Sequence, residues 1–70
     1  MIDTIYKILD DVNSFYYSYC MESNTIVKIK GYDNSSDIRD LINITNKLIE
    51  SNIEFTVTEQ KNIILKNNNL

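Results

Sequence analysis

The most regular hydrophobic pattern in the chain lies between residues 35 and 52, where apolar residues return at the spacing of one helix face. The positions are Ile38, Leu41, Ile42, Thr45, Leu48 and Ile49. Because an α-helix has about 3.6 residues per turn, they form one stripe with a polar face opposite. Ser35 or Ser36 can cap the start, and Asn52 suits the left-handed conformation in which helices often end. We therefore expect a central helix whose stripe forms the core.

A second helical pattern occupies residues 3–14. Its apolar positions are Ile2, Ile5, Ile8, Leu9 and Val12. Asp3 can cap this helix, and Asp10 and Asp11 fall on the side away from the apolar positions. The pattern predicts a shorter amphipathic helix with an acidic outer face.

Each helical pattern is followed by two short stretches rich in aromatic and β-branched residues, which suit a half-buried sheet surface. The predicted strands are 15–22, 25–31, 53–58 and 62–66. Polar residues separate the members of each pair, so each pair predicts a β-hairpin.

The first hairpin allows two pairings. A two-residue loop pairs Cys20 with Val27 and leaves Tyr17 and Tyr19 on the outer face of the sheet. A three-residue loop pairs Met21 with Val27 and places both tyrosine rings in the core. A shift of one residue turns every side chain of a strand to the other face. We favour the second pairing because it gathers more apolar surface.

The second hairpin is less ambiguous. A three-residue loop pairs Val57 with Ile63 and Phe55 with Leu65, which gives one consistent inward set. The element order predicts an α+β fold, an α-β-β-α-β-β two-layer sandwich with two helices on one face of a four-stranded, mostly antiparallel sheet. The outer sheet face is expected to carry Lys28, Lys30, Glu54, Thr56, Thr58, Ile64 and Lys66.

Residues 1–70 are expected to form one small domain with a frayed polar tail at 67–70. A chain of this size buries a thin core, and its single cysteine and lack of histidine leave no internal disulfide or Cys/His zinc set. Stability must then come from aliphatic packing or from association into a homodimer. One cysteine, no signal sequence and no long apolar run predict a cytoplasmic protein without membrane contact.

The net charge of −3 is unevenly distributed. Residues 1–24 hold four acidic residues against Lys7, whereas residues 25–70 hold six acidic and six basic residues. An acidic chain is poorly suited to the nucleic-acid backbone and better suited to a basic protein surface.

The sequence offers little support for catalysis or metal binding. Residues 33–37 resemble the start of a calcium-binding loop, but Ile38 and Ile44 stand where that loop needs glycine and glutamate. Asp10 and Asp11 point about 100° apart on their helix, and Asp37 and Asp40 are explained by the favourable start of the central helix. Cys20 has no histidine to act as its base. We expect no enzymatic activity, no cofactor and no metal site.

The aromatic run after the first helix has three interpretations. Its rings fill the core, form a protein interface, or stack on unpaired bases beside Lys28 and Lys30. For an interface, the predicted partner-binding residues are Asp10, Asp11, Tyr16, Tyr17, Tyr19 and Glu22.

Two functional hypotheses follow. The bias towards Asn, Ile, Lys and Tyr indicates an AT-rich genome, and phages and mobile elements use small acidic domains as inhibitors. The first hypothesis is a non-enzymatic inhibitor that occupies a basic site on a nucleic-acid-handling host protein, in the manner of anti-CRISPR and other anti-defence proteins. The alternative is a small nucleic-acid-binding or regulatory domain that uses an aromatic and lysine-bearing sheet face.

Overall fold

The computed structural model describes residues 2–29 and 35–66 of the chain. These residues form two helices and four strands in the predicted order. They are α1 (Ile2–Val12), β1 (Tyr17–Cys20), β2 (Thr25–Lys28), α2 (Ser35–Glu50), β3 (Phe55–Val57) and β4 (Ile63–Leu65). The predicted tail at 67–70, Lys30 and residues 33–34 of the segment that was compared with a calcium-binding loop lie outside the described residues.

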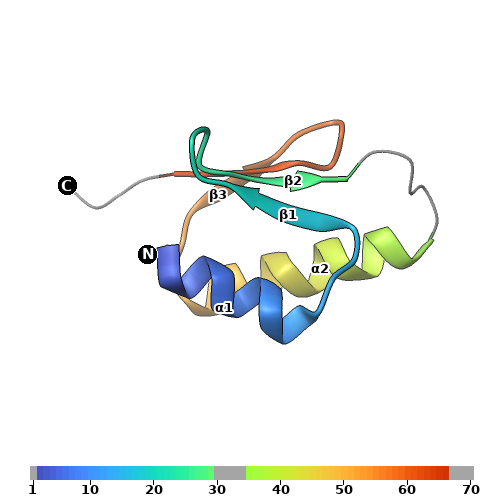
Figure 1. Ribbon diagram of the computed structural model, residues 1–70, viewed down its shortest axis with the longest axis horizontal. Helices are drawn as coiled ribbons and strands as arrows, with labels where there is room; N and C mark the ends of the chain where they lie inside the picture. The colour runs from blue at the N-terminus through green and yellow to red at the C-terminus, as the bar shows by residue number, and fades with distance from the viewer. Residues whose placement is uncertain (1, 30–34, 67–70) are drawn as a thin grey trace.

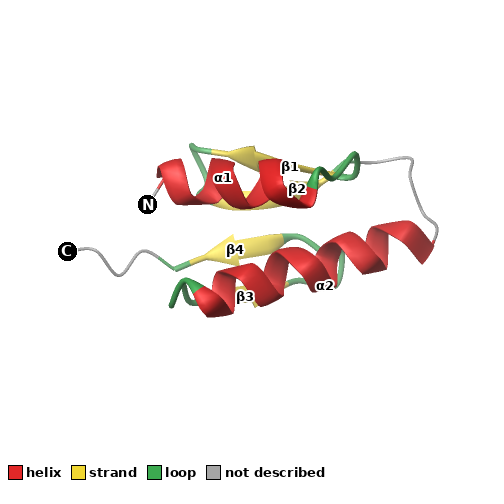
Figure 2. Cartoon of the chain, turned by 90° about the horizontal axis from the view of Figure 1, so that it is seen from below, coloured by secondary structure: helices red, strands yellow, loops and turns green. Residues whose placement is uncertain are grey.

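The strands form one antiparallel sheet in the order β1-β2-β4-β3. Both helices lie on the same side of this sheet, which confirms the predicted α+β two-layer arrangement (Figure 1). Seen from the helix side, α1 lies against β1 and β2, whereas α2 lies against β3 and β4 (Figure 2). The molecule is thus built from two αββ halves that meet where β2 pairs with β4.

Both helices end with an asparagine in the left-handed region. Asn13 has φ 55° and Asn52 has φ 58°. At the end of α2 the amide of Ile53 donates to the carbonyl of Leu48 at 3.0 Å, and the amide of Asn52 donates to the carbonyl of Ile49 at 3.0 Å. This pair of bonds satisfies carbonyls that the helix end would otherwise leave free. The prediction that Asn52 stops the central helix is confirmed.

The second hairpin has the predicted register. Phe55 pairs with Leu65 and Val57 pairs with Ile63. The amide of Thr58 donates to the carbonyl of Asn62 at 2.8 Å, which closes the expected three-residue loop.

Both predicted registers of the first hairpin were wrong. Tyr19 pairs with Ile26 and Tyr17 pairs with Lys28, across a four-residue turn. The rings face the helices, as the favoured pairing predicted, but opposite a different set of β2 side chains. As a result Lys28 points inward, and its predicted place on the outer sheet face was wrong.

The predicted buried face of α2 was partly wrong. Leu48 is fully buried as expected, and Leu41 is partly buried against the core. Ile44 and Asp37 are also fully buried, although neither belonged to the predicted stripe. Three predicted core residues, Ile38, Ile42 and Ile49, are instead 46, 52 and 62% exposed.

The core lies between the helix layer and the inner sheet face. Its buried apolar side chains come from all the described elements except β3, namely Ile5, Ile8, Tyr17, Ile26, Ile44, Leu48, Ile63 and Leu65. Phe55 of β3 packs against them while partly exposed. The core positions α1 and the β1–β2 turn, which carry the acidic members of the predicted partner-binding set, Asp10, Asp11 and Glu22.

Candidate functional site

The surface that carries the candidate site is formed by α1 and the β1–β2 turn. We define the acidic face as Asp3, Asp10 and Asp11 of α1 and Glu22 of the turn, all of which are exposed. Asp3 and Asp10 are seven residues apart and therefore lie within about 20° of each other around the helix. Ile5 and Ile8 hold α1 to the core and so turn Asp3 and Asp10 outward, whereas Asp11 lies about 100° around the helix from Asp10 and is exposed on the flank. The exposure predicted for Asp10, Asp11 and Glu22 is found.

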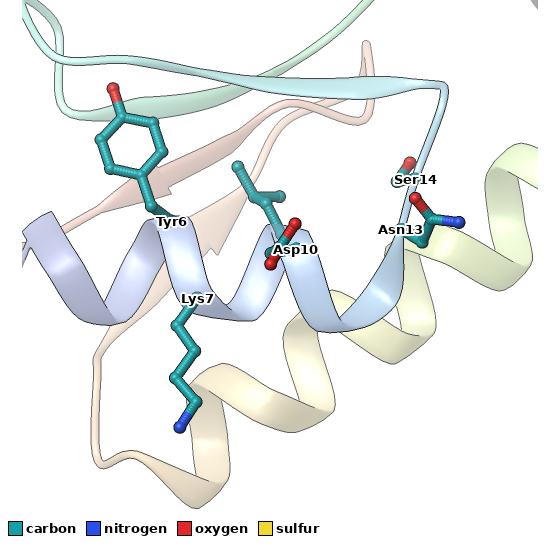
Figure 3. A pocket seen from close by; sticks show the side chains of 6 residues that line it. Tyr6, Lys7, Asp10, Asn13 and Ser14 are labelled. Carbon is teal, nitrogen blue, oxygen red and sulfur yellow. The ribbon is translucent and has the colours of Figure 1, made fainter.

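A shallow groove of about 580 Å³ runs beside α1 on this surface. It is lined by Tyr6, Lys7, Leu9, Asp10, Asn13 and Ser14 (Figure 3). Tyr6 points towards the sheet, whereas Lys7 points to the opposite side of the helix (Figure 3). The polar groups do not converge on one point, so the groove resembles a contact surface more than a small-molecule pocket.

The predicted partner-binding set omitted Asp3 and Tyr6, and Tyr6 is the aromatic residue of this surface. Its ring is 48% exposed and packs edge to face against Tyr19, with ring centroids 5.6 Å apart at 88°. The Tyr19 hydroxyl donates to Oδ1 of Asn24 at 2.6 Å, which fixes the ring behind Tyr6. The signal in the sequence was the spacing of Tyr6 and Asp10, since residues four apart lie on the same side of a helix.

The other predicted aromatic residues are less available. Tyr17 is only 4% exposed, and its hydroxyl donates to the carbonyl of Lys61 at 2.9 Å. Its assignment as a partner-binding residue was wrong, because the observed hairpin register places it in the core. Tyr16 is half-buried and packs against the core.

The burial of Tyr17 also changes its acidity. Removal from water, together with the nearby carboxylate of Asp37, raises the pKa of its phenol to about 12, while Lys28 opposes the shift. The phenol therefore stays neutral through the physiological range and serves as a hydrogen-bond donor.

The observed register removes the basis for a base-stacking sheet face. Tyr17 and Lys28 were expected to stand together on that face, but both point to the helices. Among the described residues of the outer sheet face, the side chains are instead small, aliphatic or hydroxyl-bearing, as with Ser18, Val27 and Ile64.

Lys28 points inward because a buried carboxylate lies opposite it. Asp37, in the first turn of α2, is fully buried, and its Oδ2 lies 3.1 Å from Nζ of Lys28 and 3.6 Å from Nζ of Lys61. The sequence pattern assigned Asp37 only to the favourable start of the helix. Nothing in the local sequence revealed this pairing, because the three residues come from separate elements.

Cys20 is partly exposed, and hydrogen bonds from the side chain and backbone of Ser23 lower the pKa of its thiol. The lowered pKa makes the Cys20 thiol more reactive towards alkylating reagents than an ordinary cysteine thiol. Within residues 2–29 and 35–66, no three acidic or cysteine side chains lie close enough together to hold a metal ion.

No helix in the described part of the chain has the length and apolar composition needed to cross a membrane. Comparison of the chain with protein-family models, with curated proteins and with solved structures found no match. The function is therefore inferred from the residues and their arrangement.

Proposed function

We propose that this protein is a non-enzymatic binding domain whose acidic face occupies a basic surface on another protein. The observation that carries the proposal is the exposure of Asp3 and Asp10 on the same side of α1 as the half-exposed ring of Tyr6, with Asp11 exposed on the neighbouring flank. Carboxylates guide and orient a basic partner, and tyrosine supplies apolar contact area together with a hydroxyl. Because the ring of Tyr6 already packs against Tyr19 in the free protein, less conformational entropy is lost when Tyr6 contacts a partner.

The chemical class of the partner follows from the charge. Extended basic surfaces occur most often on proteins that bind nucleic acid, because they neutralise phosphates. The proposed partner is therefore a nucleic-acid-handling protein of the host cell cytoplasm, and the bound domain would inhibit it by occupying the phosphate-binding site. Anti-CRISPR and other anti-defence proteins act in this manner, and the composition bias of the chain is compatible with a phage or mobile-element origin.

The proposal is tested by reversing the charge of the acidic face. D10K/D11K changes two exposed carboxylates that take no part in the core. At a complementary basic interface, the loss of attraction and the new repulsion should cost several kcal/mol of binding free energy. The measurement is capture from host lysate by the tagged protein, followed by identification of the captured proteins and direct measurement of affinity.

A matched control separates the effect of the acidic face on binding from the effect of net charge. E54K/E59K makes the same change in net charge at two exposed glutamates of the other αββ half. Circular dichroism confirms that both variants remain folded. The control should keep its affinity while D10K/D11K loses it, and equal losses would show that the acidic face is only a solubilising surface.

A mobility-shift assay with single- and double-stranded DNA and RNA completes the test. The proposed function predicts no binding of the free protein to nucleic acid at low salt. Binding that weakens steeply as salt is added would contradict the proposal, because such dependence reports phosphate contacts. The captured host protein, in contrast, should lose its own nucleic-acid binding when the domain is added.

A further inference from the structure

The side of α2 that was predicted to lie in the core carries a continuous row of exposed apolar side chains. We define the outer stripe as Ile38, Ile42, Thr45 and Ile49. The three isoleucines are 46, 52 and 62% exposed. Single exposed isoleucines are common on protein surfaces, but a row along one helix is typical of an interaction surface.

Thr45 does not interrupt the apolar character of this row. Its hydroxyl lies 2.9 Å from the carbonyl oxygen of Leu41 and 3.0 Å from that of Ile42, so its donor is used within the helix. Covering the outer stripe would therefore leave no hydroxyl donor of Thr45 unsatisfied.

The position of α2 leaves the outer stripe accessible. Asp40 accepts a hydrogen bond from the Ser14 hydroxyl at 2.7 Å and so marks the side of α2 that faces the end of α1. At about 100° per residue, the centre of the outer stripe lies roughly 170° away from Asp40. Figure 2 shows α1 and α2 side by side, with the other flank of α2 at the edge of the molecule. Neither α1 nor the sheet needs to move for a partner to dock.

The spacing of the outer stripe is the same when it is read in either direction. Its members follow one another by four, three and four residues. When two copies of α2 lie antiparallel, Ile38 of one copy therefore stands opposite Ile49 of the second, and Ile42 stands opposite Thr45. Every apolar position then has an apolar position or a threonine across from it.

The polar residues beside the outer stripe repeat the same spacing, and their charges favour one relative orientation of two α2 helices. They are Arg39, Asn43, Asn46 and Glu50, all exposed and all on one flank of the helix. An antiparallel pair brings Arg39 of each copy opposite Glu50 of the other, which gives two pairs of opposite charge. In a parallel pair the two-fold axis runs along the helices and puts this flank of the two copies on opposite sides of the interface, so Arg39 and Glu50 would meet no opposite charge from the same flank.

We infer that the outer stripe is a self-association surface, on which α2 pairs antiparallel with α2 of a second copy of this chain. The stripe is four side chains long, so the interface falls below the approximately 800 Å² per partner of a stable complex. The dimer is therefore weak, with a dissociation constant of about 10 µM or higher. The acidic face belongs to the other αββ half and stays accessible in the pair.

Sedimentation equilibrium from about 10 µM to about 1 mM tests the inference at the protein concentrations where so small an interface can form. The wild-type protein should show a reversible monomer–dimer equilibrium. I42K places a charge in the middle of the stripe at a position already half-exposed in the monomer, and it should weaken the dimer by about 100-fold or more. The matched control is I2K, at an isoleucine of α1 that is 45% exposed, and it should dimerise as the wild type does.

Charge exchange tests the antiparallel orientation. R39E and E50R each place like charges opposite each other at two points of the pair and should each weaken the dimer about tenfold. R39E/E50R restores both pairs and should recover wild-type dimerisation. The two residues lie eleven positions apart on one helix, so within one copy they cannot compensate for each other. Both changes suit the helix dipole, so neither should impair folding of the monomer.

Three results would overturn the inference. They are a wild-type protein that stays monomeric throughout the concentration range, an I42K variant that dimerises as well as I2K, and a double charge exchange that does not recover the loss seen in each single variant. In the first case the outer stripe is free for a different protein.

Discussion

At the residue scale, the most unusual feature is the fully buried carboxylate of Asp37. Its Oδ2 lies 3.1 Å from Nζ of Lys28 and 3.6 Å from Nζ of Lys61, and no described residue donates a hydrogen bond to either carboxylate oxygen. A buried carboxylate is tolerated only because opposite charges accompany it. The ion pair ties α2 to β2 and to the loop before β4, three elements that are distant in the sequence.

Removing this carboxylate should be costly. We expect D37A to lower the free energy of unfolding by about 3–5 kcal/mol, because the mostly buried ammonium group of Lys28 loses the carboxylate that lies 3.1 Å from it. The exposed control D11A should change it by less than about 0.5 kcal/mol. Replacing the pair with apolar side chains, in K28M/D37L, should recover much of the loss. Urea denaturation of the three variants measures these values, and a D37A value close to that of D11A would show that the ion pair is dispensable.

Tyr17 gives the fold a dependence on alkaline pH. Its phenol has a pKa raised from 10.0 to about 12 in the folded protein. Between these values the unfolded chain loses the proton and the folded protein keeps it, so stability is full below pH 10 and falls as pH rises towards 12. Y17F removes this titration but leaves every other alkaline group in place. Denaturation at pH 9, 10 and 11 should therefore show a shallower decline for Y17F than for the wild type. Parallel declines would contradict the assignment.

At the element scale, the two hairpins show when a register can be predicted. In β3 the apolar residues Phe55 and Val57 flank the polar Thr56, and this alternation favours the pairing that puts Phe55 and Leu65 on the same face. In the first hairpin apolar residues occupy both faces, as Ile26 and Val27 illustrate, so alternation cannot select a pairing. The inward position of Lys28 depends on Asp37 in another element, which local patterns do not contain.

The central helix illustrates a different limit. Its aliphatic residues cover an arc of about 160°, from Ile44 to Ile42, whereas the sheet and α1 cover only part of this arc. The pattern therefore predicts a helix and its end but not which aliphatic residues are buried. Burial of Asp37 beside Lys28 turns the buried face by roughly 70° from the predicted one, towards Ile44.

Alanine substitutions can measure the orientation of this helix. I44A and L48A remove fully buried side chains and should each lower the free energy of unfolding by about 2–5 kcal/mol. I42A and I49A remove half-exposed side chains and should each cost less than about 1 kcal/mol in the dilute monomer. Chemical denaturation at low protein concentration compares the four. Larger losses for I42A and I49A would restore the orientation that the sequence pattern predicts.

The candidate site was predictable to a similar extent. The exposure of Asp10 follows from helical spacing, since it lies opposite Ile5 and Ile8, whereas Asp11 is only three residues from Ile8 and lies at the edge of the buried face. Tyr17 was misassigned because its position depends on the hairpin register.

At the scale of the whole molecule, the sheet portions of the two αββ halves are joined by a short seam. Only two residue pairs link β2 to β4, Thr25 with Ile64 and Ile26 with Ile63. An asparagine stands at each end. Nδ2 of Asn24 donates to the backbone carbonyl of Leu65 at 3.1 Å, and the backbone carbonyl of Asn24 accepts from the amide of Leu65 at 3.0 Å. At the other end, Oδ1 of Asn62 accepts from the amide of Lys28 at 2.8 Å.

These two side chains extend the seam beyond its strand pairs, so the halves should separate more readily without them. N24A removes the side-chain bond to β4 and also disfavours the left-handed backbone at φ 51°, and N62A leaves the part-buried amide of Lys28 without its acceptor. We expect each to lower the free energy of unfolding by about 1–3 kcal/mol. Matched controls are N43A and N46A, at exposed asparagines of α2, which should cost less than about 0.5 kcal/mol.

In hydrogen exchange, the amides of Ile26 and Ile63 should lose protection in N24A and N62A before those of α1 do, because opening starts where the halves meet. Uniform loss of protection across both halves would show instead that the domain opens as a single unit.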